Sequence, residues 1–304
     1  MTRLPNFFLL GAAKSGTTAL YFWLETRPEV HLSSPKEPYF FEDEYDRGLD
    51  FYWQTYFARG YAGQPLVGDC RAAHLYLPYV PSRIHATVPD ARLVAILRNP
   101  VERAFSHWWM QRCNGREKLG FDAALRANRQ AIEAGDSFEG ERAEELWRAR
   151  LMTSRDHRGI RPVTARNLIE PGHYAQQLER YLEYFPRERL CVLLHDDLRA
   201  EPVPTLQRLA AFLGLDPAQV ESPPRSVNEA LTNVSLPLYR ISRRLQLERV
   251  VPRRVLAALR TWISRFGSRP QMSDEARAWL RQHYAPHNRR LEALLDRDLG
   301  AWER

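Results

Sequence analysis

The sequence predicts an α/β fold in which a P-loop-like parallel sheet is flanked by helices and followed by a helical C-terminal tail. Short apolar runs at 7–10, 92–97 and 190–194 each end in a polar turn, and a helical pattern follows. Strands that alternate with helices in this way are typical of parallel sheets. Because no internal repeat or low-complexity linker interrupts the 304 residues, we expect a single domain over 1–304.

The first strand–turn–helix unit is the most informative part of the chain. The run Phe7–Leu10 is followed by Gly11, Lys14 and Gly16 and then by two threonines that suit the start of a helix. The spacing nearly matches the P-loop pattern G-x-x-x-x-G-K-[ST], but the lysine lies inside the loop and Thr17 takes its usual place. Because unpaired N–H groups at a helix N-terminus carry partial positive charge, the sequence predicts an anion site here.

The next segment, 34–41, combines charged and aromatic residues. Lys36 and Glu37 precede the aromatic run Tyr39–Phe41. This pattern has two interpretations. Glu37 is either a carboxylate that accepts a proton in a reaction, or one half of a surface ion pair in front of an aromatic anchor.

A further strand is expected at 66–69, after an aromatic-rich helical segment at 51–61. Arg71 and His74 follow this strand. His74 could be an auxiliary acid–base group, or it could only cap the end of the strand, and we slightly favour the structural role.

The unit at 92–108 repeats the strand–turn–helix order. Arg98 ends the apolar run, at the position where open α/β sheets bind their ligands. Pro100 suits a first helical turn, and Ser106 lies eight residues after Arg98. An arginine fork and a serine hydroxyl are suitable donors for a phosphate, although the pair could also be a strand cap and a solvated helix residue.

The rest of the chain is expected to be mainly helical. Segment 115–170 is a possible insertion, which could contribute to acceptor binding or form a solvated helical hairpin. Gly214 is expected to end a helix at 205–213. Ser273 is expected to begin a final helix pair, or one long helix, over 273–302.

Segments 7–20, 34–41 and 92–108, in this order and at these distances, resemble the sulfotransferases that use 3′-phosphoadenosine 5′-phosphosulfate (PAPS). The similarity is greatest to the heparan sulfate sulfotransferases and their bacterial relatives, and it also includes 171–214. It implies that a sulfuryl group moves from PAPS to a hydroxyl or amine acceptor, a glycan or another small alcohol. Adenosine 3′,5′-bisphosphate would be the product, and no metal would be required.

The same resemblance assigns roles to individual residues. It implies that Glu37 is the catalytic base, that Lys14 acts on the leaving phosphate, and that Arg98 and Ser106 bind the 3′-phosphate. The remaining contacts to the 5′-phosphosulfate would come from the backbone of Ser15, Gly16, Thr17 and Thr18.

One stretch departs from the family pattern. Where the family often has an acidic residue followed by lysine or serine and then proline, this chain has Asp69-Cys70-Arg71. Arg71 could replace the missing lysine, and His74 could assist the chemistry.

Composition and charge agree with a polyanionic donor. The formal charge is +7, from 44 lysines and arginines against 37 acidic residues. The basic residues are dispersed, so we expect no nucleic-acid partner. Three scattered cysteines indicate a reducing compartment, and the apolar run near the N-terminus is too short to span a bilayer. We therefore expect a cytoplasmic protein without a membrane partner, of unknown oligomeric state.

No metal site is expected from the sequence. His283 and His287 lie four residues apart on the expected last helix, but the sequence shows no third ligand and no zinc-type pairing with cysteines. We therefore expect an ordinary surface pair.

Two other functions stay open at this point. A P-loop-type kinase that uses ATP would share the loop and the sheet, but the position of Lys14 and the Arg98–Ser106 pair argue against it. A non-catalytic module that binds a nucleotide or a polyanion is opposed by the presence of Lys14 and Glu37. The sequence does not identify the acceptor, which could also be a lipid or a polyketide.

Overall fold

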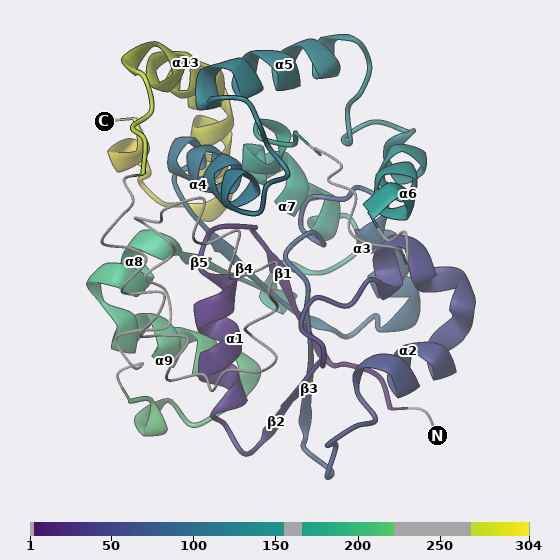
Figure 1. Ribbon diagram of the computed structural model, residues 1–304. Coiled ribbons are helices and arrows are strands. Elements are labelled where there is room, and N and C mark those ends of the chain that lie inside the picture. The colour runs from purple at the N-terminus through teal and green to yellow at the C-terminus, as the bar shows by residue number, and fades with distance from the viewer. Residues whose placement is uncertain (1–2, 155–165, 222–268, 304) are drawn as a thin grey trace, which may run out of the picture.

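The computed structural model describes residues 3–154, 166–221 and 269–303. Its centre is a five-stranded sheet with the order β2-β3-β1-β4-β5 (Figure 1), in which every neighbouring pair is parallel. The strands are β1 (Phe7–Gly11), β2 (Val30–Leu32), β3 (Leu66–Cys70), β4 (Arg92–Leu97) and β5 (Leu190–Leu194). Because β1 has β3 on one side and β4 on the other, the winding of the chain reverses at β1. Open α/β sheets bind their ligands at such a switch point.

Helices cover both faces of this sheet and one of its ends. In the described ranges they are α1 (Thr17–Glu25), α2 (Gly48–Tyr56), α3 (Val80–Thr87), α4 (Pro100–Cys113), α5 (Phe121–Glu133), α6 (Ala143–Ser154), α7 (Tyr174–Leu182), α8 (His195–Ala200), α9 (Pro202–Leu213) and α13 (Asp274–Leu295). The α/β fold predicted from the sequence, with its C-terminal helix, is confirmed.

Several helix ends follow from single residues. Gly214 ends α9 in the left-handed conformation, with φ of 79°, as predicted. The Ser273 side chain accepts a hydrogen bond from the Ala276 N–H and caps α13, which is one long helix. The aromatic-rich helix α2 ends at Tyr56, earlier than the predicted residue 61.

The two faces of β1 point into two different hydrophobic clusters. Phe8 and Leu10 pack with residues of α2, α3 and α7, whereas Phe7 and Leu9 pack with residues of α1 and α9. Each such side chain stabilises the fold by about 1.5–3 kcal/mol when fully buried. Gly68 of β3 makes room for Phe7, because a Cβ there would lie 2.2 Å from the Phe7 ring. A sheet buried on both faces holds the ends of its strands in fixed positions.

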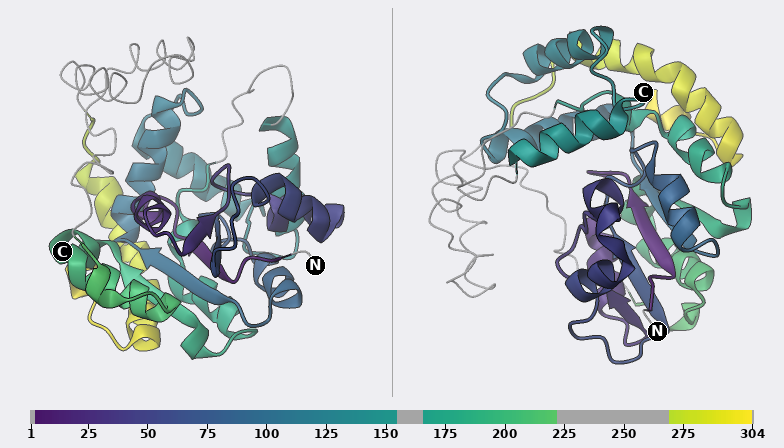
Figure 2. Two further views of the ribbon diagram at one scale, coloured as in Figure 1. Left: turned by 90° about the horizontal axis from the view of Figure 1, so that it is seen from below. Right: turned by 90° about the vertical axis from the view of Figure 1, so that its right-hand side faces the viewer.

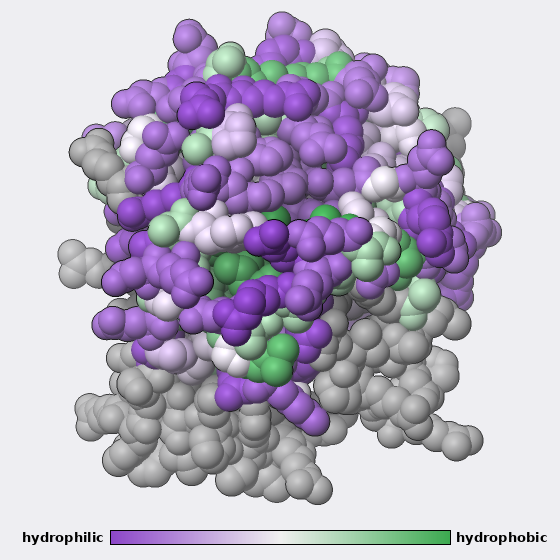
Figure 3. All heavy atoms as spheres, turned by 90° about the horizontal axis from the view of Figure 1, so that it is seen from above, coloured by the Kyte–Doolittle hydropathy of each residue, from purple (hydrophilic) through white to green (hydrophobic). Residues whose placement is uncertain are grey.

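A third hydrophobic cluster joins α4, α5 and α13, with Phe105, Trp108, Phe121 and Tyr284 among its members. Figure 2 (right) shows α5 and α13 arching over one end of the sheet. From above, this end is covered mostly by hydrophilic residues, with apolar groups in small patches between them (Figure 3). Within the described ranges, no helix has both the length and the apolarity needed to cross a bilayer.

Candidate active site

The loop 12–16 connects β1 to α1 through an unusual backbone. Three residues have positive φ, namely Gly11 (151°), Lys14 (72°) and Gly16 (112°). A Cβ at Gly16 would lie 3.2 Å from the Ile96 side chain, in a left-handed conformation that side chains disfavour. The two glycines of the P-loop-like pattern are therefore required by the shape of this turn.

Helix α1 begins at Thr17, directly after the loop. The Ala19 and Leu20 N–H groups donate to the Gly16 carbonyl oxygen over 2.9 and 3.3 Å, and Gly16 provides no side-chain cap for the N–H groups of Thr17 and Thr18. These N–H groups and the positive end of the helix dipole form a site that favours an anion.

Four cationic side chains gather around this loop: Lys14, Lys36, Arg98 and Arg269. Burial lowers the pKa of Lys14, and Arg98, Arg269 and Lys36 lower it further. Burial also lowers the pKa of Arg98 and of Arg269, and Arg98 lowers that of Arg269 further. Like charges that disfavour each other's ionised form would be stabilised by an anion placed between them. The cluster therefore marks an anion site more strongly than the loop alone.

Arg98 lies directly after β4, as predicted, and its position is fixed by backbone contacts. Its Nη1 donates to the Lys14 carbonyl oxygen over 3.3 Å, and its own carbonyl oxygen accepts a hydrogen bond from the Tyr174 hydroxyl over 2.9 Å. Ser106 lies two turns along α4 and is 8% exposed. The structure thus places Arg98 at the loop, with Ser106 on the helix that follows it.

Arg269 is a member of the cluster that the sequence did not reveal. Its guanidinium lies over the Phe105 ring, 4.6 Å from the ring centre. Phe105 directly precedes Ser106 in the sequence. Its Nε and Nη2 atoms are buried without a hydrogen-bond partner in the described ranges. Two buried, unsatisfied donors on a cation whose pKa Arg98 lowers are suitable for binding an anion.

Glu37 is joined to the loop through a lysine. Lys36 Nζ donates to Thr18 Oγ1 over 3.1 Å and to Glu37 Oε1 over 3.2 Å. The other carboxylate oxygen of Glu37 accepts the Ala72 N–H over 3.0 Å and lies 3.4 Å from Nη1 of Arg71. The Glu37 side chain is 31% exposed. It is therefore an ion-paired carboxylate that solvent can still reach.

His74 lies beneath this arrangement and has no exposed surface. Its Nδ1 is 3.9 Å from Asp69 Oδ1, and its ring meets the Phe41 ring edge-on. Burial and the nearby Arg71 lower the pKa of His74 well below its usual value. This placement agrees with the structural role that we favoured, because a fully buried imidazole cannot touch an acceptor in this conformation.

The buried carboxylate next to His74 is also neutralised by its surroundings. Burial raises the pKa of Asp69 to about 8, and the hydrogen bond donated by the Tyr52 hydroxyl opposes this shift. Asp69 is the acidic residue after which the chain departs from the family pattern, at Cys70 and Arg71. In this structure it belongs to the core beneath the site.

The described part of segment 115–170 packs on both sides of the site. Helix α6 contacts the Glu37 side, where Trp147 Nε1 donates to Glu42 over 2.9 Å and Glu42 accepts Arg71 Nη2 over 2.7 Å. Helix α5 packs on α4, with the Phe121 ring 4.9 Å from that of Phe105. Residues 155–165 of the predicted insertion lie outside the described residues. The described helices are therefore part of the body of the protein.

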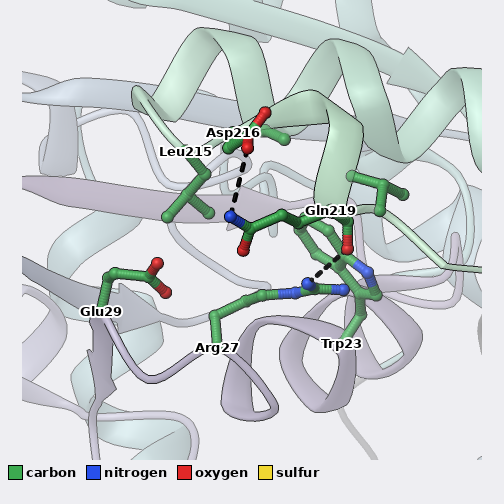
Figure 4. Close-up of a pocket in the computed structure, with 8 residues that line it drawn as sticks. Trp23, Arg27, Glu29, Leu215, Asp216 and Gln219 are labelled. Atoms are coloured by element: carbon green, nitrogen blue, oxygen red, sulfur yellow. Dashed lines mark hydrogen bonds between the residues drawn. The ribbon is translucent and has the colours of Figure 1, made fainter.

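A small hollow lies at the other end of α1. Its Arg27 donates to the Gln219 carbonyl oxygen over 2.9 Å, and the Gln219 side chain donates to Asp216 over 3.1 Å (Figure 4). Arg27 Nε and Trp23 Nε1 are buried there without a hydrogen-bond partner among the described residues. The length of α1 separates this hollow from the loop 12–16, so the hollow has no part in the anion site.

The fold and the site define an α/β protein with an anion site at the switch point of a parallel sheet, and a carboxylate at its edge. Comparison with known proteins identifies the family. A model of the sulfotransferase domain matches residues 4–249, and the chain therefore belongs to the sulfotransferase family of enzymes.

Several relatives agree with this family. The chain is 28% identical, over 99% of its length, to human bifunctional heparan sulfate N-deacetylase/N-sulfotransferase 3, and 28% identical, over 71%, to the N-deacetylase/N-sulfotransferase 2 of Bos taurus. The chain spans only 31% and 22% of the length of these two relatives. A solved sulfotransferase from Alicyclobacillus acidocaldarius is 27% identical with a TM-score of 0.67, and the match covers 99% of this chain and 100% of that one.

Proposed function

We propose that this protein transfers a sulfuryl group from PAPS to a hydroxyl or amine group of a glycan or another small alcohol. The observation that carries the proposal is the crowding of Lys14, Arg98 and Arg269 around the N-terminus of α1. Arg98 and Arg269 lower the pKa of Lys14, burial lowers the pKa of Arg98, and Arg98 lowers that of Arg269. A donor with two separated phosphate groups would supply negative charge beyond that of Glu102 and Asp196, the carboxylates that act on Arg98.

The loop 12–16 and Lys14 would hold the 5′-phosphosulfate. Sulfuryl transfer resembles phosphoryl transfer in that negative charge grows on the leaving phosphate as the S–O bond breaks. A cation and N–H groups that are already aimed at that oxygen lower the barrier without further reorganisation. Lys14 has this position in the proposal, together with the N–H groups that follow it in the loop and in the first turn of α1.

Arg98, Ser106 and Arg269 would hold the 3′-phosphate. A guanidinium binds phosphate through two parallel N–H donors, and a serine hydroxyl adds a neutral one. The orphaned Nε and Nη2 atoms of Arg269 support its inclusion. Discrimination between donors with and without a 3′-phosphate would therefore depend on α4 and on residues near 269.

Glu37 is the proposed base. The acceptor oxygen or nitrogen would attack sulfur as the S–O bond to the 5′-phosphate breaks, and its proton would pass to the Glu37 carboxylate. Adenosine 3′,5′-bisphosphate would leave. Lys36 bridges Glu37 to Thr18 at the start of α1, which brings the carboxylate to the edge of the anion site.

A glycan is the acceptor that the relatives favour, because two of them are named for N-sulfotransferase activity on heparan sulfate. An amine on a sugar is therefore the first acceptor to test, followed by sugar hydroxyls. The contact of α6 with Glu42 supports an acceptor surface formed by 34–47 and α6.

The deciding experiment incubates the protein with PAPS and pools of N-deacetylated heparan, other glycans and small alcohols, and detects added sulfonate by mass spectrometry. We expect PAPS-dependent transfer to at least one pool. Phosphate transfer from ATP would indicate a kinase, and tight binding of the bisphosphate without transfer to any pool would indicate a non-catalytic module.

We also propose a cytoplasmic location. Three cysteines without a disulfide among the described residues support it, with Cys70 and Cys113 buried and Cys191 half-buried. Fractionation of cells that express the natural gene would test it, and recovery in the membrane fraction would oppose it.

A further inference from the structure

Three histidines from two helices meet on the side of α7 that faces α13. His283 and His287 lie one turn apart on α13, and His173 directly precedes α7. One ring nitrogen from each lies within 4.8 Å of the others, and His173 Nε2 is 2.9 Å from His283 Nε2. The expectation of an ordinary surface pair was wrong, because a residue 110 positions earlier in the chain supplies a third imidazole.

A carboxylate orients the central histidine. Glu139, from the connection between α5 and α6, lies 2.9 Å from His173 Nδ1 through its Oε2 atom. When this carboxylate accepts a hydrogen bond from the Nδ1–H group, the lone pair of Nε2 is left facing His283. Histidines that bind metals are usually held by a carboxylate on their other nitrogen in this way.

We propose that His173, His283 and His287 bind one divalent transition-metal ion of the Zn²⁺ class. Three imidazoles with one open position are a recurrent zinc set, in which each nitrogen lies about 2.0–2.1 Å from the metal. Two nitrogens on a tetrahedral ion at that distance are about 3.3 Å apart, close to the separation of His173 and His283.

One adjustment is needed. The rings of His173 and His287 are stacked, with centres 4.0 Å apart and planes 6° from parallel, so their in-plane lone pairs do not yet converge. His287 is only half-buried and can turn about its side-chain torsions. His283 is held against Trp279 by ring stacking at 5.1 Å. Metal binding by all three rings therefore requires one side chain to rotate.

The ion would act as a clamp between α7 and α13. Tyr174, next to His173, donates to the carbonyl oxygen of Arg98, so α7 forms part of the wall behind the proposed 3′-phosphate site. A metal that joins the two helices would stabilise this wall without taking part in sulfuryl transfer. Its presence would be detected by binding and stability, and these readouts do not depend on the proposed function.

The test uses the full-length protein without a histidine tag, stripped with a chelator and titrated with Zn²⁺ in a calorimeter. We expect one ion per chain and a rise of about 5 °C in the melting temperature at saturating Zn²⁺. Co²⁺ should give the visible absorption bands of a tetrahedral site. His287→Ala should weaken Zn²⁺ binding by about 100-fold, and Glu139→Gln by about 10–100-fold.

The matched control is His85→Ala, because His85 contacts the Phe185 ring, away from the cluster. It should bind Zn²⁺ like the wild type. Circular dichroism of each stripped variant reports whether it has folded. The proposal is overturned if the folded wild type takes up no Zn²⁺, or if folded His287→Ala and His173→Ala bind it as tightly as the His85→Ala control.

Discussion

Lys14 lies among like charges, and this determines what its replacement should do. In Lys14→Ala the repulsion with Arg98 and Arg269 disappears, so the donor should still bind. The charge that grows on the leaving phosphate would lose its cation, and we expect the single-turnover rate to fall by about 10²–10³-fold. Rapid-quench measurements with saturating PAPS test this. Lys118→Ala, at an exposed lysine, is the control. A loss confined to the donor Kd would contradict the assigned role.

Arg98 should instead determine the affinity for the donor. We expect Arg98→Ala to weaken binding of adenosine 3′,5′-bisphosphate by about 1.5–3 kcal/mol and to remove most of its preference over AMP. Arg269→Ala should act in the same direction. Calorimetry with both nucleotides measures the effect, with Arg129→Ala as a control, since Arg129 forms an exposed ion pair with Glu133. Equal affinities of the wild type for AMP and the bisphosphate would remove the basis of this assignment.

Two substitutions decide whether Glu37 or His74 is the catalytic base. Glu37→Gln keeps the shape of the side chain but cannot accept the proton, so we expect a rate loss of about 10²–10⁴-fold with donor affinity nearly intact. His74→Ala should lower stability, because His74 is fully buried, and should change the rate of the folded enzyme little. If His74→Ala abolishes the activity of the folded enzyme while the rate of Glu37→Gln stays within a few-fold of wild type, the base has been misassigned.

At the scale of elements, the turn between β1 and α1 depends on its glycines. Gly16→Ala places a Cβ at a φ of 112° and 3.2 Å from Ile96, so it should destabilise the protein by about 1–2 kcal/mol and weaken donor binding. Gly60→Ala is the matched control, because Gly60 has a φ of 82° with nothing within 4 Å. Both variants pay the backbone cost, but only Gly16→Ala should lose donor affinity in calorimetry. Equal donor affinities in the two variants would show that the shape of the turn does not matter.

Elements whose signal is local could be predicted from the sequence. The strand before Gly11, the caps at Ser273 and Gly214, and the position of Arg98 each depend on a few adjacent residues. Arg269 could not be found in this way, because its partners lie more than 150 positions away and an isolated arginine has no distinctive pattern.

The same limit explains two other differences between sequence and structure. Whether His74 faces the acceptor or the core is decided by the packing of Phe41 and Tyr181 around it, residues from two other parts of the chain. The pairing of His173 with α13 depends on how two distant helices dock. Local pattern carries no information on such contacts, whereas it does fix strands, turns and caps.

At the scale of the whole molecule, buried histidines should make stability depend on pH. Burial, with Arg103 and Lys14 nearby, lowers the pKa of His107 to about 3, so its ring stays neutral in the folded protein. In the unfolded chain it binds a proton below about pH 6.5. Stability from this group is therefore complete above pH 6.5 and is lost as pH falls toward 3, by at most about 1.4 kcal/mol per pH unit.

His107→Gln isolates this contribution. The free energy of unfolding is measured by urea titration between pH 6.5 and 4.5. It should fall less steeply with decreasing pH in His107→Gln than in wild type, and the difference in slope should correspond to the uptake of close to one proton on unfolding. The chelator-stripped protein is used, so that bound metal does not add to the slope. Parallel curves for the two proteins would show that His107 is protonated in the folded state.

The reversal of winding at β1 has a consequence for how this protein could change its substrate. Lys14 and Arg98 follow β1 and β4, whereas Glu37 and Arg71 follow β2 and β3, on the other side of the switch point. The two groups meet only where β1 ends. Under the proposed function, mutations in 34–47 or in α6 would therefore change the acceptor surface and leave the donor site intact. A lineage built on this plan would diversify in the acceptors that it modifies while it keeps one sulfuryl donor.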